Sequence, residues 1–206
     1  MRPWLKPGTL SLIFAATGAG KTMFCLSIAF AITTNKAIGN WKVETAVSCL
    51  YIDSEMPYDD LRSRISRIRK SLPEQLVSSY ILSSDLMRAA NEQPPNLVNK
   101  NWQEAISQTL KDNNAIKLVI LDNISSLFPG PDENAKHYWD PVNQWILELR
   151  SLGVAFILVH HTGKNEDQRG ITGRLDNLDV SIKLSRLRIT RRKKAQDSTS
   201  NLGLWQ

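Results

Sequence analysis

The stretch AATGAGKT, residues 15–22, decides the fold class of this chain. It follows an apolar run that predicts a buried strand over Thr9–Ala15, and it opens a segment with helical spacing over Lys21–Thr33. In such a turn, glycines let backbone N–H groups curl around a phosphate, a lysine reaches the β- and γ-phosphates, and a threonine hydroxyl binds Mg²⁺. Strand, glycine-rich turn and helix in this order predict a phosphate-binding loop.

The loop assigns nucleotide contacts to consecutive residues. These are Thr17, Gly18, Ala19, Gly20, Lys21, Thr22 and Met23. The common form of the motif begins with glycine, and here Ala15 takes that place. Alanine is tolerated there if the position needs no positive φ. The alternative is a glycine-rich strand–helix turn that binds no ligand.

Further apolar runs alternate with helical patterns, which is typical of a parallel α/β sheet covered on both faces. Additional strands are expected over Ala46–Asp53, Lys117–Asp122 and Val154–His160. Helices are expected from Pro57 through Leu72, around Trp102–Leu110, and from Pro141 to near Gly153, with a loop over Asn91–Asn101 and a turn over Phe128–Glu133. We expect one domain over residues 1–206, with a polar loop over 161–177 and a basic end over 178–206 containing short antiparallel strands.

Composition narrows the class of protein. The 206 residues are 42% hydrophobic and 22% charged, which is enough for one α/β domain with its own core. Two cysteines, Cys25 and Cys49, form neither a disulfide framework nor a zinc cluster, so a reducing, cytoplasmic setting is expected. The apolar run Leu10–Ala16 is too short to span a membrane, and no signal peptide or membrane partner is expected.

The net charge of +6 is unevenly distributed. Residues 161–206 hold 10 Lys and Arg against 5 Asp and Glu, whereas residues 1–160 hold 16 against 15. Such a basic segment favours a nucleic-acid partner, although a solvated or self-associating surface gives the same pattern.

Two acids follow predicted strands and suit phosphate chemistry. Asp122 ends an apolar strand, where an acid can organise Mg²⁺; otherwise it caps the next helix. Glu55 lies just beyond the second strand and can activate water as a general base. Asp53 competes for that role or serves as a structural hydrogen-bond partner, and we favour Glu55.

The strand Val154–His160 runs into ILVHHTGK, residues 157–164. Neighbouring side chains of a strand point to opposite faces, so His160 and His161 do not readily share one ligand. This argues against zinc. One histidine is expected to face the nucleotide, and we favour His160. The alternative is a polar strand end without a role.

Together, the segments AATGAGKT, YIDSEMP, LVILDNISSL, WDPVNQWILELRSLGVAFILVHHTGK and QRG resemble the RecA-like P-loop ATPases of the plasmid RepA type, which are related to the DnaB-like hexameric replicative helicases. The resemblance covers about Pro7 to Leu187. It implies a RecA-like P-loop NTPase core with a mostly parallel twisted sheet flanked by helices, and a homo-oligomeric, often hexameric ring with ATP between subunits.

The resemblance also implies roles for individual residues. Glu55 matches the catalytic glutamate, Asp122 the acid that organises Mg²⁺, and His160–His161 a γ-phosphate sensor. Basic residues further along match groups that act on a neighbour's ATP or contact DNA. These candidates are Lys164, Arg169, Arg174, Arg188, Arg191, Arg192 and Lys193.

The expected function is therefore a Mg²⁺-dependent ATPase, the motor core of a hexameric helicase that acts on single-stranded DNA in replication. The alternative is a regulatory or recombination ATPase that binds DNA or a protein without unwinding. Weaker alternatives are a non-motor binding module, which ATP only locks into an assembly, and a small-molecule kinase.

Overall fold

The structure is a computed structural model and describes residues 1–130, 136–162 and 177–185. Six strands form one sheet in the order β3-β2-β4-β5-β1-β6, and all five pairings between these strands are parallel. The strands are β1 (Leu10–Ala15), β2 (Ser48–Asp53), β3 (Ser79–Ser83), β4 (Ile116–Asp122), β5 (Ala155–His161) and β6 (Val180–Lys183). Because the strands are parallel, their carboxyl ends meet at one edge of the sheet.

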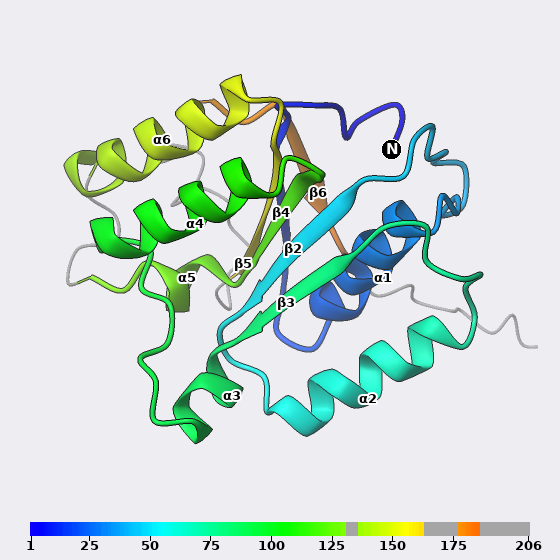
Figure 1. Cartoon of the computed structure of the whole chain (residues 1–206), viewed down its shortest axis with the longest axis horizontal. Coiled ribbons are helices and arrows are strands. Elements are labelled where there is room, and N and C mark those ends of the chain that lie inside the picture. The colour runs from blue at the N-terminus through cyan, green and yellow to red at the C-terminus, as the bar shows by residue number, and fades with distance from the viewer. Residues whose placement is uncertain (131–135, 163–176, 186–206) are drawn as a thin grey trace, which may run out of the picture.

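Helices cover both faces of the sheet (Figure 1). They are α1 (Lys21–Thr33), α2 (Tyr58–Arg69), α3 (Ser84–Ala89), α4 (Lys100–Asp112), α5 (Ile124–Leu127) and α6 (Lys136–Ser151). Helices α1 and α2 pack on one face, and α4, α5 and α6 pack on the other, whereas α3 lies at the carboxyl end of β3 (Figure 1). None of the described helices is long and apolar enough to span a membrane.

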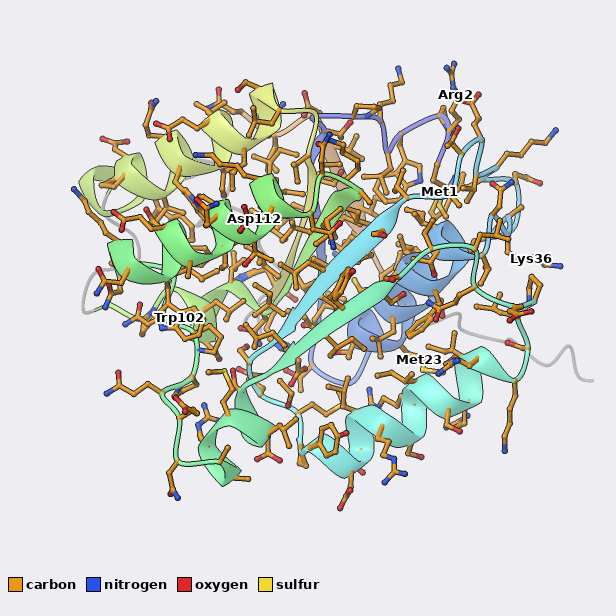
Figure 2. The ribbon with its side chains drawn as sticks, viewed as in Figure 1. Met1, Arg2, Met23, Lys36, Trp102 and Asp112 are labelled. Carbon is orange, nitrogen blue, oxygen red and sulfur yellow. The ribbon has the colours of Figure 1, made fainter. Side chains whose placement is uncertain are left out.

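The central strands separate two hydrophobic clusters. In β5, Phe156 and Leu158 belong to the cluster under α4 and α6, whereas Ile157 and Val159 belong to the cluster under α1 and α2. All four side chains are 0% exposed. Burial on both faces explains why this strand shows no polar alternation in the sequence. Met23 of α1 lies on the side of α2 and extends the second cluster (Figure 2).

The expected mostly parallel α/β sheet is confirmed, with strand ends that differ from the predictions by one or two residues. The C-terminal antiparallel strands are the exception. The described strand in that segment, β6, runs parallel to β1, with Val180 opposite Ser11. The expectation is wrong for Val180–Lys183, and residues 186–206 lie outside the described part of the chain.

Helix α6 begins at Lys136, five residues before the expected start at Pro141. Proline is usually placed in the first turn because it has no N–H to donate. Here the residues ahead of it remain helical because Trp139 is 2% exposed and packs against Phe128 with ring centroids 5.1 Å apart. Burial of the large Trp139 ring offsets the backbone hydrogen bond that Pro141 cannot donate inside the helix.

Candidate active site

The phosphate-binding loop joins β1 to α1. Gly18 and Gly20 have φ values of 74° and 94°, and Gly20 is the N-cap of α1. Only glycine adopts such angles without strain, which explains these two positions. Ala15 is the last residue of β1 and does not have a positive φ. The alanine that replaces the usual glycine therefore fits at this position.

Lys21 opens α1 and turns back into the loop. Its Nζ donates hydrogen bonds to the carbonyl oxygens of Ala15 (2.9 Å) and Ala16 (3.1 Å), and the residue is 3% exposed. Burial lowers the pKa of Lys21 below its ordinary value, opposed mainly by the negative charge of Asp122. An ammonium group at the start of a helix, next to a glycine-rich loop, favours an anionic ligand.

Asp53 and Asp122 end the neighbouring strands β2 and β4 and lie opposite each other in register. They are 2% and 5% exposed. Asp122 Oδ2 accepts a 2.6 Å hydrogen bond from the Tyr51 hydroxyl, and Asp53 Oδ2 accepts one of 3.0 Å from the Met56 N–H. Burial and then the charge of Asp122 raise the pKa of Asp53 to about 7. The pair thus holds less than two full negative charges near neutral pH.

Glu55 lies beyond β2 and has a half-exposed side chain. Its Oε1 accepts a short hydrogen bond from the Ser126 hydroxyl of α5, and its Oε2 lies 3.6 Å from His161 Nε2. Burial raises the pKa of Glu55, but hydrogen bonds from Ser126 and Asn123 outweigh it, so the net pKa is lowered. Glu55 is therefore an ionised, accessible carboxylate fixed at one oxygen, whereas Asp53 is buried and its pKa is raised.

The two adjacent histidines of β5 point to opposite faces of the sheet. His161 lies beside Glu55, on the face that carries α1, as its alternation with Val159 requires. His160 falls on the other face, with Leu158. This geometry fits the sequence argument that the two do not readily share one ligand. His161 is the histidine that lies beside Glu55, and the choice of His160 as the one facing the nucleotide stays a prediction. Burial and then the charge of Lys21 lower the pKa of His161.

Thr22 lies in the first turn of α1, next to Lys21, and is partly exposed. A hydroxyl here and the Asp122 carboxylate offer the oxygen ligands that Mg²⁺ prefers. Mg²⁺ commonly takes only one or two carboxylates and completes its shell with phosphate oxygens and water. Within the described ranges no group of three or more His, Cys, Asp or Glu side chains could hold a metal. The Thr22 hydroxyl and the Asp122 carboxylate fit the small share of protein ligands that Mg²⁺ takes beside phosphate oxygens.

Four polar side chains of this region were not singled out by sequence reasoning: Tyr51, Ser54, Asn123 and Ser126. Ser54 connects β2 to β4, because its hydroxyl donates to the carbonyl oxygen of Asp122 (3.0 Å) and accepts from the Asn123 N–H (2.9 Å). Asn123 caps α5 by accepting from the Ser126 N–H (3.1 Å). In the sequence, the signal that could have identified Asn123 and Ser126 is a helix N-cap pattern directly after the buried strand β4.

The basic candidates form a separate group. Lys164, Arg169 and Arg174 fall within 163–176, and Arg188, Arg191, Arg192 and Lys193 fall within 186–206. All seven lie outside the described residues. The described site therefore consists of the loop around Lys21 and the acids and histidine opposite it.

Comparison with known proteins identifies the family. Residues 1–167 match the AAA domain family AAA_25. The chain belongs to this AAA domain family. The match includes the phosphate-binding loop, both strand-end acids and both histidines of β5. No curated protein sequence matches the chain.

Solved structures show the same fold as this AAA domain. A KaiC-like protein of Pyrococcus horikoshii OT3 superposes with a TM-score of 0.53 at 19% identity, covering 81% of this chain and 67% of its own. The flagellar accessory protein FlaH of Methanocaldococcus jannaschii gives a TM-score of 0.56 at 14% identity, covering 87% and 72%. The expected RecA-like core is confirmed, and family and fold together support a RecA-like P-loop ATPase.

Proposed function

We propose that this chain is a Mg²⁺-dependent ATP hydrolase in which Glu55 activates the attacking water. The observation that carries the proposal is the position of Glu55. It is an ionised carboxylate at the carboxyl edge of the sheet, held at one oxygen by Ser126 and close enough to Lys21 for their charges to interact. Lys21 marks the side of the β- and γ-phosphates, so a water bound to Glu55 would lie on the side of the γ-phosphate.

The reaction divides among named groups. Glu55 accepts a proton from water as the water oxygen forms a bond to the γ-phosphorus, and the bond from that phosphorus to the β,γ-bridging oxygen breaks, releasing ADP and phosphate. Backbone N–H groups of the loop and the Lys21 ammonium stabilise charge on the phosphoryl oxygens. Thr22 and Asp122 would hold Mg²⁺, which when bound neutralises phosphate charge. Asp53 would act through the charge and position of Asp122.

His161 is the stronger candidate for the γ-phosphate sensor. With its pKa lowered, the ring is neutral near pH 7, so its 3.6 Å approach to Glu55 is no ion pair at that pH. A neutral imidazole can donate one hydrogen bond, either to Glu55 or to a phosphate oxygen. Changing that partner when phosphate leaves would transmit the state of the site to the segment after β5.

The direct test is steady-state ATP hydrolysis with Mg²⁺ for the wild type and for Glu55→Gln. We expect Glu55→Gln to lower kcat by about 10²–10⁴-fold, the usual contribution of a general base, while nucleotide affinity stays within a few fold. Asp53→Asn serves as the comparison for the competing carboxylate. Full activity in Glu55→Gln together with loss in Asp53→Asn would assign the base to Asp53 and contradict the proposal.

We further propose that the chain works as a ring, often hexameric, that moves along single-stranded DNA as the motor core of a replicative helicase. The resemblance to RepA- and DnaB-type enzymes and the basic excess over residues 161–206 support this proposal. Hydrolysis should then rise when single-stranded DNA is added. Turnover that depends on Glu55 but ignores DNA would favour the alternative, a regulatory or recombination ATPase.

A further inference from the structure

A cleft of about 300 Å³ is lined by Ser126, the residue that donates a hydrogen bond to the proposed catalytic Glu55. It lies at the carboxyl ends of β3, β2 and β4, because Ser84, Ser54 and Ser126, which line it, follow those three strands. The phosphate-binding loop follows β1, which is two strands beyond β4 in the sheet. The cleft and the phosphate-binding loop are therefore separate sites. Glu55 connects them, because its carboxylate accepts a hydrogen bond from Ser126, which lines the cleft.

The cleft presents hydrogen-bond donors without matching acceptors. Ser84 is 1% exposed and lines the cleft, and its hydroxyl makes no hydrogen bond to another described residue. Arg88 is exposed and has no ion pair within the described ranges. Asn96 uses its Oδ1 to accept from the Val98 N–H, which leaves its NH₂ group available.

The described residues that line the cleft carry no carboxylate. They are Ser54, Ser84, Arg88, Gln93, Pro94, Pro95, Asn96, Ser126 and Pro129. Among these residues the Arg88 guanidinium, the Ser84 hydroxyl and the side-chain amides of Gln93 and Asn96 can donate hydrogen bonds, which favours an oxyanion as the ligand. The Ser84 hydroxyl lines the cleft and can donate its proton to an oxyanion there.

We propose that this cleft binds a phosphate group other than those of the nucleotide, held by Arg88, Ser84 and Asn96, and that its binding draws the Ser126 hydroxyl away from Glu55. The coupling rests on the proposed function of Glu55, whereas the binding does not. Ser126 has a single hydroxyl proton, which it donates to Glu55, so an anion that accepts this proton competes with the glutamate. The phosphate belongs either to a small molecule or to a nucleic-acid backbone.

Binding is tested first, by NMR with inorganic phosphate as the probe. Full-length Lys21→Ala protein is used, so that the cation of the nucleotide loop does not compete. The backbone amide signals of Ser84 and Ser126 should shift saturably, and Arg88→Gln should weaken the affinity at least about tenfold. Arg62→Gln, an exposed position on α2, is the matched control and should leave the affinity unchanged. Absent shifts, or equal affinity in Arg88→Gln, would overturn the site.

A short thymidine oligonucleotide distinguishes the two sources of phosphate. If it shifts the same amides at a concentration at least tenfold lower than inorganic phosphate does, the ligand is a nucleic-acid backbone. If inorganic phosphate binds as well or better, the ligand is a small molecule. Both results support the site.

Coupling is tested by following the carboxyl carbon of Glu55 through a pH titration. Because the Ser126 hydrogen bond lowers the pKa of Glu55, phosphate in the cleft should raise the titration midpoint more in protein with the wild-type Ser126 than in Ser126→Ala, where only the phosphate charge acts. Equal shifts in the two proteins would overturn the coupling. An unchanged midpoint despite bound phosphate would overturn the coupling. These readouts need no hydrolysis, so failure of the ATPase proposal and failure of the cleft proposal give different results.

Discussion

At the scale of single residues, the buried carboxylate of Asp53 makes the stability of the fold depend on pH. Its pKa is raised to about 7 by burial and by the charge of Asp122, from an ordinary value of 3.8. A raised pKa means that the folded state binds the proton more tightly than the unfolded state does. The stabilisation is therefore full below about pH 4 and is lost as the pH rises through about 7.

Asp53→Asn keeps an acceptor for the Met56 N–H and removes the titration. In nucleotide-free protein, the melting temperature of Asp53→Asn minus that of the wild type should increase from pH 5 to pH 8. Thermal unfolding at four pH values measures this difference. Asp60→Asn, on the exposed surface of α2, is the control and should give a flat difference. A flat result for Asp53→Asn as well would mean that Asp53 ionises normally in the folded protein.

Ala15 permits a test of the altered phosphate-loop motif. Because this residue has an ordinary strand conformation, Ala15→Gly should leave nucleotide affinity unchanged and lower the free energy of unfolding by about 0.5–1 kcal/mol. Chemical denaturation and titration with a fluorescent nucleotide measure the two quantities. A much tighter nucleotide complex in the glycine variant would show that the Ala15 methyl group distorts the loop.

Residues with distinctive chemistry at strand ends could be predicted, and those that act only through a neighbour could not. Lys21, Glu55 and Asp122 follow from a motif and from acids placed directly after apolar runs. Ser126 is one serine among many in the sequence. Its relation to Glu55 depends on β2 and β4 being adjacent in the sheet, which the order of strands along the chain does not specify.

At the scale of elements, helix α6 is held mainly by one buried stripe. Leu149 is 2% exposed and belongs to the hydrophobic cluster under α4 and α6, whereas Leu152, just beyond the helix, is 50% exposed. Leu149→Ala should cost about 2–5 kcal/mol of unfolding free energy, because it removes buried apolar contacts and leaves a cavity. Leu152→Ala should cost far less. Urea denaturation of both variants gives the comparison, and similar costs would contradict the packing described for α6.

The elements that the sequence pattern missed are the half-exposed and the short ones. Strand β3 lies at an edge of the sheet, with Tyr80 40% exposed and serines at both ends, so it lacks the continuous apolar run of β4 or β5. Helix α3 has six residues, too few to show a periodicity. Elements buried on both faces could be predicted, because burial itself imposes the apolar pattern.

At the scale of the whole molecule, the proposed DNA contacts depend on charge. The late basic segment contains Trp205 as its single aromatic residue, so backbone phosphate contacts should outweigh base stacking. Affinity for single-stranded DNA should then fall linearly in a log–log plot against salt, with a slope of about −0.7 for each phosphate contacted. Fluorescence anisotropy at several salt concentrations measures the slope. An affinity that does not change with salt would contradict this mode of binding.

The sheet order also governs how the chain must acquire its structure during synthesis. Strand β1 leaves the ribosome before the other described strands, yet its two neighbours, β5 and β6, are the last two of these strands. Its six residues, all buried in the finished fold, have no sheet partner until most of the domain has been made. Pairings between distant segments form slowly and leave apolar strands open to aggregation. The phosphate-binding loop, carried by β1, is thus translated before the other described strands but takes its working shape only after β5 has been made.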